Sequence, residues 1–152
     1  MIIAIERLSL QELKVFLREQ ADDAFPDLKD NERLNILAEK WHTYAEFCTC
    51  RNDNGHLLGM IAFYANQPEE GVVYLPHVYV RSDCRGQKIM TSMFQIIEKY
   101  AKEKDFESFR LEVSKNNEIA QKAYFHYGFS YSGEASAKSI YLQFNFSKYD
   151  GK

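Results

Sequence analysis

The sequence has few cysteines and prolines and no long apolar run, and each scarcity excludes a class of protein. Three cysteines cannot all pair within one chain, so a disulfide-built scaffold is not expected, and free thiols are typical of a reducing cytoplasm. No stretch approaches the roughly 20 apolar residues of a membrane-spanning helix. The segment 1–10 lacks the basic start and apolar run of a signal peptide. We therefore expect a cytoplasmic protein without a membrane partner.

An excess of positive charge is also missing. Nineteen Lys and Arg residues against 22 Asp and Glu residues give a formal net charge of -3, so we expect no nucleic-acid partner, and any anion site must be local. What the chain does have is apolar and aromatic residues, at 45% and 14%, which is typical of a folded globular protein. With 152 residues and no linker, repeat or low-complexity tract, the sequence predicts a single domain over residues 1–152.

The apolar periodicity predicts the element order β-α-α-β-β-β-α-β-α-β-β. Helices are expected after the capping box that begins at Ser9, from near Asp30, from Ile89 to about Lys104, and from Asn117 to Tyr127. The first of these helices should end at Pro26. Strands are expected at residues 2–6, 44–51, 56–65, 75–80, 109–114, 129–133 and 139–146. Early hairpin strands followed by β-α-β-α predict an α/β (α+β) fold, with a mixed, mostly antiparallel sheet of about six or seven strands and about four flanking helices.

The stretch from Leu75 to Met90 is the most informative part of the sequence. It reads as a buried strand, a polar turn and the start of a helix, with Pro76 favouring a bulge or a sheet edge. A strand that enters a helix through Arg85 and Gly86 leaves free backbone N–H groups at the helix start. These groups and the helix dipole together predict an anion site, most naturally for phosphate.

Three segments resemble the GNAT superfamily of acyl-CoA-dependent N-acyltransferases. The first is Val78–Val80 followed by Arg85-Gly86-Gln87-Lys88-Ile89-Met90, which is similar to the family's strand and pyrophosphate loop. That loop has the signature Arg or Gln, two residues, Gly, one residue, then Gly or Ala. The second comprises Leu111-Glu112-Val113, Asn117, Ala120, Tyr124 and Gly128-Phe129, close to the family's Asn-x-x-Ala-x-x-x-Tyr-x-x-x-Gly-Phe run. The stretch Leu58–Tyr64 resembles the family's third strand.

The resemblance implies acetyl-CoA as co-substrate and assigns tasks to residues of this chain. Its pyrophosphate would bind the backbone of the loop formed by Arg85, Gly86, Gln87, Lys88, Ile89 and Met90. The backbone of Val78, Tyr79 and Val80 would pair with the pantetheine arm, and an amide there would polarise the thioester carbonyl. Asn117 would lie beside the pantetheine. Tyr124 would lie near the sulfur as general acid, since a phenol is neutral at pH 7 and can donate a proton.

The chain departs from the family pattern at three points. Lys88 stands where the signature has Gly, and Met90 stands where it has Gly or Ala. Lys88 could meet a phosphate or point into solvent. The third departure concerns the general base, because the Glu that many members carry on the strand is absent. His77 is the candidate base, since histidine titrates near neutrality; Tyr74, Glu112 through water, or no dedicated base remain open.

Two hypotheses for function follow. The first is transfer of an acetyl group from acetyl-CoA to a primary amine of a small molecule or peptide, by direct attack in a ternary complex. The alternative is a non-catalytic acyl-CoA sensor or scaffold with a degenerate loop, which the substitutions at Lys88 and Met90 favour. No metal is expected, because Cys48, Cys50 and His56 lack a second ligand pair. The loop lacks a Gly-Lys-Ser/Thr ending, which argues against nucleotide hydrolysis. A homodimer stays open.

Overall fold

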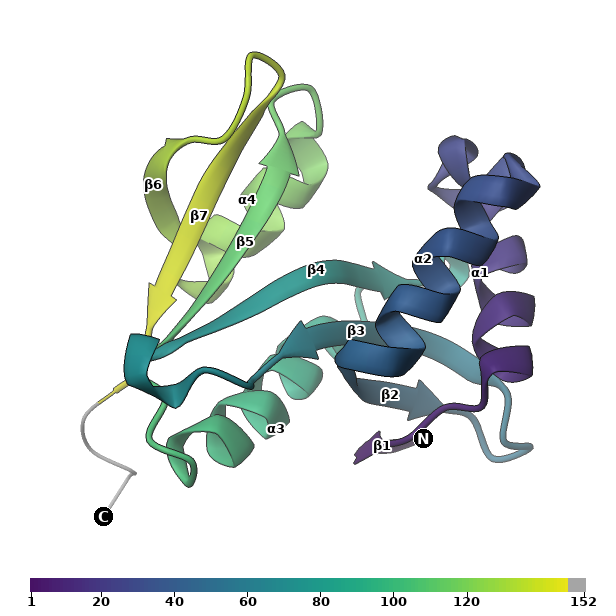
Figure 1. Cartoon of the computed structure of the whole chain (residues 1–152), viewed down its shortest axis with the longest axis horizontal. Helices are drawn as coiled ribbons and strands as arrows, with labels where there is room; N and C mark the ends of the chain where they lie inside the picture. Colours follow the sequence, from purple (N-terminus) through teal and green to yellow (C-terminus); the bar gives the residue numbers. More distant parts are fainter. Residues whose placement is uncertain (148–152) are drawn as a thin grey trace. The chain divides into compact units, whose positions relative to one another are not determined.

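The computed structural model describes residues 1–147, and within them it has the order of strands and helices predicted from the sequence. The strands form one sheet in the order β1-β2-β3-β4-β5-β7-β6, in which β4 and β5 are parallel (Figure 1). They are β1 Ile2–Glu6, β2 Glu46–Arg51, β3 Leu57–Tyr64, β4 Val72–Val80, β5 Ser108–Ser114, β6 Ser130–Glu134 and β7 Ser139–Asn145. The helices are α1 Leu10–Asp23, α2 Asn31–Tyr44, α3 Ile89–Lys102 and α4 Glu118–Tyr127. This mixed sheet with flanking helices confirms the predicted fold class.

Contacts divide the chain into two compact units. The first comprises residues 1–64 and 77–97, and the second comprises residues 65–76 and those from Glu98 onward. The strand β4 and the helix α3 each contribute residues to both units. The predicted phosphate loop therefore belongs to the first unit, whereas Asn117 and Tyr124 belong to the second.

In the first unit, local signals fix where the two N-terminal helices begin. The Ser9 hydroxyl accepts a hydrogen bond from the Glu12 N–H at 3.1 Å, and the Asp30 carboxylate accepts one from the Arg33 N–H at 3.2 Å. Both caps satisfy helix-start amides. The sequence predicts the cap at Ser9, and for the second helix it predicts only a start near Asp30. The helix α1 ends at Asp23, earlier than the expected stop at Pro26, and Pro26 instead opens a short 3-10 turn.

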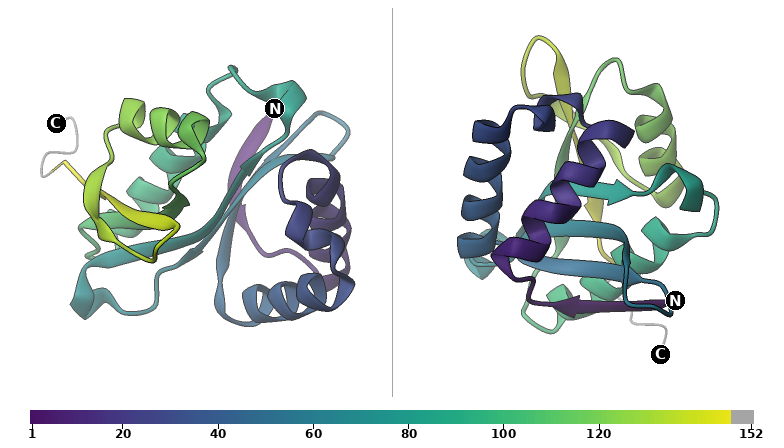
Figure 2. Two further views of the ribbon diagram at one scale, coloured as in Figure 1. Left: turned by 90° about the horizontal axis from the view of Figure 1, so that it is seen from above. Right: turned by 90° about the vertical axis from the view of Figure 1, so that its right-hand side faces the viewer.

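Helices cover both faces of the strands in the first unit (Figure 2). On one side α1 and α2 bury a common cluster with the strands, formed by residues such as Leu13, Phe16, Leu17, Leu34, Ala38, Trp41, Phe47, Met60 and Tyr79. On the other side α3 approaches β3 closely at Gly59. A Cβ on Gly59 would meet the Met93 side chain at 3.3 Å and the Ile89 side chain at 3.4 Å. The missing side chain therefore lets α3 pack against this strand.

Two strands, β2 and β4, begin more than one residue away from the expected position. The helix α2 continues to Tyr44, so β2 begins at Glu46 rather than at Tyr44. The strand β4 begins at Val72 rather than at Leu75, because residues Val72–Leu75 pair with β5 in parallel register. This pairing depends on a strand some 36 residues later in the chain, so local composition does not reveal it. Pro76, which follows the paired segment, has no N–H to donate.

The second unit is built on an aromatic core beside β5 and β7. Phe109 contacts the rings of Phe129, Phe144 and Phe146 at centroid distances of 6.3, 6.1 and 4.7 Å. The strands β5 and β7 pair antiparallel along their whole length, and β6 pairs with β7. The helix α4 covers this core, because the ring of its Tyr124 contacts Phe129 at 5.7 Å.

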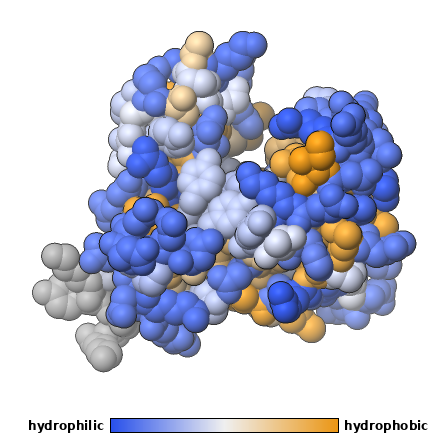
Figure 3. Space-filling model, in the orientation of Figure 1, coloured by the Kyte–Doolittle hydropathy of each residue, from blue (hydrophilic) through white to orange (hydrophobic). Residues whose placement is uncertain are grey.

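The surface and the helices give no sign of a membrane-spanning segment or metal centre in the described residues. Within residues 1–147, no helix is long and apolar enough to cross a membrane. The same residues contain no cluster of three or more His, Cys, Asp or Glu side chains that could hold a metal ion. The face seen in Figure 3 is largely hydrophilic, with small and separate apolar patches. On α2 the apolar side chains of Ile36 and Tyr44 are exposed, as some apolar side chains are on most folded proteins.

Candidate functional site

The predicted phosphate loop runs from the end of β4 to the start of α3 and has an unusual backbone. Gly86 has φ +85° and Lys88 has φ +60°, both in the left-handed region. Gly86 adopts such a conformation without strain, but the Cβ of Lys88 crowds its own backbone there. Lys88 stands at the position where the family signature has Gly. The loop thus keeps the backbone path that favours glycine, although the residue has changed.

The loop presents a row of unused backbone donors. Among the described residues, none accepts a hydrogen bond from the backbone N–H groups of residues 85–91. The Ser92 N–H is the first to bond into the helix, to the Lys88 carbonyl at 3.0 Å. Arg85, Gly86, Gln87 and Lys88 are exposed, while Ile89 is buried and anchors the first turn of α3. Free N–H groups at the positive end of a helix dipole are suited to an anion such as a pyrophosphate.

The last residues of β4 alternate between two faces of the strand. His77 and Tyr79 are buried at 7% and 4% exposure and contact residues of α1 and α2. Val78 and Val80 are half-buried and point to the opposite face, because successive strand residues alternate. Hydrogen bonds fix the strand exit, by which we mean residues 79–82, at two backbone groups. The Arg81 N–H donates to the Leu58 carbonyl at 2.9 Å, and the Arg85 guanidinium donates to the Val80 carbonyl at 3.2 Å.

A carboxylate from α1 reaches this strand exit. Asp23 is the last residue of α1, and its Oδ2 accepts hydrogen bonds from the Tyr79 hydroxyl at 2.5 Å and from the Ser82 N–H at 3.1 Å. Its Oδ1 accepts a hydrogen bond from the Ser82 hydroxyl. The bonds from Ser82 and then Tyr79 lower the pKa of Asp23, and the positive charge of Arg85 adds to this effect. Burial and the bond to Asp23 raise the pKa of Tyr79, so its hydroxyl remains the donor.

His77 lies in an aromatic cage rather than at an open site. Its ring lies between Phe25 and Trp41, with centroids at 4.6 and 4.9 Å, and its Nε2 is 2.5 Å from Oε1 of the buried Gln20. Burial lowers the pKa of His77 to about 4, so the imidazole is neutral at physiological pH. A base needs access to the amine and a pKa near the working pH. The surroundings of His77 provide neither, which argues for a packing task.

Of the two site residues predicted from the second segment, Tyr124 lies on α4 and Asn117 immediately precedes this helix. Asn117 caps this helix, because its Oδ1 accepts a hydrogen bond from the Ala120 N–H at 3.1 Å. This leaves the side-chain amide NH₂ group without an acceptor among the described residues. Tyr124 is 8% exposed, and burial raises its pKa. A buried phenol with a raised pKa stays protonated at pH 7, which is the form a general acid needs.

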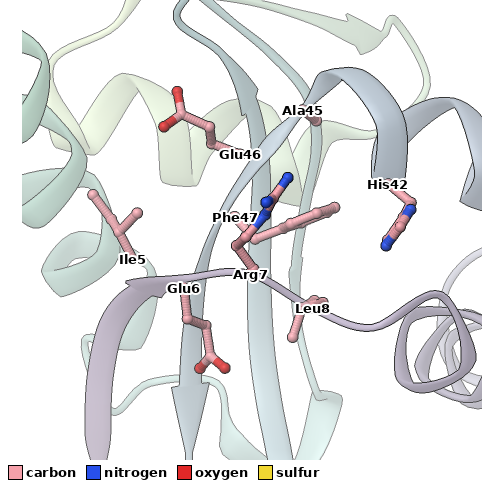
Figure 4. Close-up of a pocket in the computed structure, with 8 residues that line it drawn as sticks. All are labelled: Ile5, Glu6, Arg7, Leu8, His42, Ala45, Glu46 and Phe47. Atoms are coloured by element: carbon pink, nitrogen blue, oxygen red, sulfur yellow. The ribbon is translucent and has the colours of Figure 1, made fainter.

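A pocket of about 420 Å³ lies elsewhere in the first unit, between the end of β1 and the end of α2 (Figure 4). It is lined by Ile5, Glu6, Arg7, Leu8, His42, Ala45, Glu46 and Phe47. The two carboxylates in this lining, Glu6 and Glu46, point in opposite directions in Figure 4. Glu6 bonds Arg51 at 2.9 and 3.0 Å, which lowers its pKa. The pocket contains none of the predicted site residues and no converging acid pair.

Sequence reasoning missed two residues that support the strand exit, Gln20 and Asp23. Gln20 falls at a buried position of the apolar stripe that contains Leu13, Phe16 and Leu17, and it is 0% exposed. A polar residue in such a stripe was the available signal, since buried amides are normally hydrogen-bonded. Asp23 offered a weaker signal, because acidic residues at a helix C-terminus are disfavoured by the helix dipole.

Comparisons with known proteins show the family and the fold. The model of the acetyltransferase (GNAT) family matches residues 10–129, which include parts of both units. The PaiA N-acetyltransferase from Thermoplasma acidophilum, solved in complex with coenzyme A, is similar in structure. The two share 17% identity at a TM-score of 0.72, over 96% of this chain and 100% of that one. A GNAT-family acetyltransferase from Staphylococcus aureus Mu50 gives 18% identity and a TM-score of 0.70, over 96% and 100% of the two chains.

At such low identity the structural likeness shows the shared fold alone. No curated protein matches the sequence. The family model, however, covers most of the chain, and its matched residues include the loop, Asn117 and Tyr124. The chain therefore belongs to the acetyltransferase (GNAT) family.

Proposed function

We propose that this protein transfers an acetyl group from acetyl-CoA to a primary amine of a small molecule or peptide, by direct attack in a ternary complex. The observation that carries the proposal is the row of N–H groups from residue 85 to residue 91, at the start of α3, which have no acceptor among residues 1–147. Such a row at the positive end of a helix dipole is suited to a pyrophosphate. The family membership supplies the link to acyl-CoA chemistry.

The residues present fit this co-substrate. In the proposal the loop amides hold the pyrophosphate, the backbone of Val78–Val80 holds the pantetheine arm, and Asn117 lies beside that arm. Acetyl-CoA supplies an activated thioester, and Tyr124 gives a proton to the departing sulfur. The raised pKa of Tyr124 keeps that proton available at neutral pH.

The mechanism also needs a group that takes the proton from the amine. His77 does not fit this role, because its ring is buried and its pKa is lowered to about 4. We propose that the amine loses its proton to solvent, directly or through Glu112. The Glu112 carboxylate is exposed and accepts a hydrogen bond from the Ser139 hydroxyl at 2.6 Å. A Glu112→Gln variant tests this role. It should lose activity toward amines of high pKa more than toward amines of low pKa, which need no base.

The test of the function is thiol release from acetyl-CoA in the presence of a panel of primary amines. Turnover with at least one amine, together with calorimetric binding of coenzyme A, is the expected result. No binding of coenzyme A, acetyl-CoA or other short acyl-CoA would remove the proposal entirely. Binding without turnover on any amine would instead support the second candidate, an acyl-CoA sensor. The sensor candidate is favoured by Lys88, which stands in the loop where the family signature has Gly.

A matched pair of variants at Gly86 locates the phosphates. No described atom lies within 4 Å of a Cβ built on Gly86, so a small side chain fits there, although φ +85° strains both the alanine and the aspartate. Gly86→Asp should bind coenzyme A more weakly than Gly86→Ala, because only the aspartate adds negative charge beside the pyrophosphate. Equal dissociation constants for the two variants would place the phosphates elsewhere.

A further inference from the structure

The clearest unassigned feature of the first unit is the carboxylate of Asp23, which accepts hydrogen bonds from donors at the strand exit. The Tyr79 hydroxyl, the Ser82 N–H and the Ser82 hydroxyl all donate to it. These donors come from the end of β4 and from the first residue of the 3-10 turn Ser82–Cys84, which leads into the phosphate loop. The three bonds connect α1 to the root of the loop across 56 to 59 residues of sequence.

The position of Asp23 in its own helix makes this arrangement informative. As the last residue of α1, its negative charge lies at the negative end of the helix dipole, where an acidic residue is unfavourable. The negative charge also lies near Arg85, the first residue of the loop signature. A carboxylate beside a phosphate site repels the phosphate unless hydrogen-bond donors offset its negative charge. The hydrogen bonds from Tyr79 and Ser82 to Asp23 provide this offset.

The contacts beyond Ser82 show which part of the loop is held and which is left open. The Cys84 N–H bonds the Arg81 carbonyl at 2.9 Å, and the Arg81 guanidinium bonds Asp83 at 2.9 and 3.1 Å. These contacts are local, within three residues. Asp23 contributes the side-chain bonds that reach the turn from another element of the first unit. Beyond Arg85 the amides have no described partner.

From these contacts we infer that Asp23 is a positioning residue, which holds the root of the loop so that the amides of residues 85–91 are pre-arranged for the pyrophosphate. The inference rests on the proposed function, because it takes the loop to be the acyl-CoA site. Asp23 touches neither co-substrate nor amine in this role. Without Asp23 the loop samples other conformations. The apparent dissociation constant then rises in inverse proportion to the fraction of time that the loop spends in the binding-competent conformation.

The decisive variant is Asp23→Ala, with Asp22→Ala as the matched control. Asp22 precedes it and is exposed, and its side chain makes no hydrogen bond or ion pair with a described residue. Both variants remove one negative charge, but only Asp23→Ala removes the bonds to Tyr79 and Ser82. We expect the dissociation constant for acetyl-CoA to rise about tenfold in Asp23→Ala, the size of one lost charge-assisted bond, and to stay unchanged in Asp22→Ala.

A truncated thioester separates positioning from a general structural role. S-acetylpantetheine lacks the pyrophosphate, so a loop that binds phosphate cannot help to bind it. Asp23→Ala should raise KM for acetyl-CoA with little change in kcat, and should leave kcat/KM for S-acetylpantetheine as in the wild type. Equal losses with both thioesters would overturn the inference, and so would unchanged values with both.

Two milder variants keep the test valid if Asp23→Ala does not fold. Tyr79→Phe keeps the ring, which contacts Phe16 and Phe25 at 5.6 and 6.0 Å, and removes only the hydroxyl. Ser82→Ala removes one donor from an exposed turn. Each should weaken acetyl-CoA binding in the same direction but by less than Asp23→Ala. An unchanged dissociation constant in both would overturn the inference.

Amide hydrogen exchange tests the inference without any co-substrate. If Asp23 holds the root of the loop, the Ser82 amide should exchange faster in Asp23→Ala, with unchanged exchange in β2 and β3. Exchange in Asp23→Ala that equals the wild type at Ser82 would refute the positioning role. A wild type that fails to bind coenzyme A would refute the proposed function instead, so the two failures are distinguishable.

Discussion

Lys88 offers a direct test of how closely the loop follows its family, because its backbone is left-handed with φ +60°. A side chain in this region costs about 1–2 kcal/mol relative to a right-handed conformation. Glycine removes that strain, but it gains about 0.5–1 kcal/mol of conformational freedom in the unfolded chain. The difference predicts that Lys88→Gly stabilises the protein by about 0.5–1 kcal/mol. For a chain of this size, that corresponds to a rise in Tm of about 1–4 °C.

Matched variants distinguish this backbone effect from an effect of charge. Lys88→Ala removes the same charge and keeps a Cβ, so it should give no gain in stability. Lys88→Asn should fall between Gly and Ala, since asparagine tolerates the left-handed region better than most residues. The measurement is thermal and urea unfolding of the four proteins at low and high salt. Equal stabilisation by Gly and Ala would refute the strain argument and assign the effect to the lysine charge.

Three further predictions concern His77, Tyr124 and Arg51. The pKa of His77 is lowered to about 4 by burial, so the unfolded chain binds its proton first and stability should fall from about pH 6.5 to pH 4, by at most about 3 kcal/mol. Urea unfolding across pH tests this, and His77→Gln should flatten the curve over that range; a curve unchanged in His77→Gln would contradict the prediction. Tyr124→Phe should lower kcat by roughly 10²–10⁴-fold with nearly unchanged binding of acetyl-CoA, and equal turnover in mutant and wild type would end the acid assignment. Arg51 bonds Glu6 and Glu12 through both carboxylates, so Arg51→Ala should destabilise the fold by about 1–3 kcal/mol by equilibrium unfolding, and a change below a few tenths would contradict that estimate.

Local signals explain why much of the fold could be predicted from the sequence. The caps at Ser9 and Asn117 depend on contacts three residues away, so the pattern that predicts them also forms them. The start of β4 could not be placed in this way. Its first residues, Val72–Leu75, are held by parallel pairing with β5, and no local feature marks such a distant partner.

In the candidate site, too, some features could be predicted from local sequence and others depend on distant contacts. The loop residues and Tyr124 stand at positions that a sequence signature marks, and the row of amides without an acceptor in the described part of the chain follows from a strand that enters a helix. The departure at Lys88 was also visible, but its left-handed backbone was not, because φ depends on the path of the whole turn. The burial of His77 could not be predicted from the sequence either. A histidine on a strand looks the same whether its face meets solvent or the rings of Phe25 and Trp41.

The residues that escaped prediction belong to one feature of the first unit, the contact between α1 and the exit of β4. Gln20 and Asp23 are three residues apart, so they lie on one face of α1, and they bond His77 and Tyr79, which share one face of β4. Three residues rise about 4.5 Å along a helix and two residues rise about 6.6 Å along a strand, close enough for both pairs to form at once. Each pair joins residues 56 or 57 positions apart. Polar side chains placed this way fix how the strand meets the loop, so their value is in orientation more than in stability.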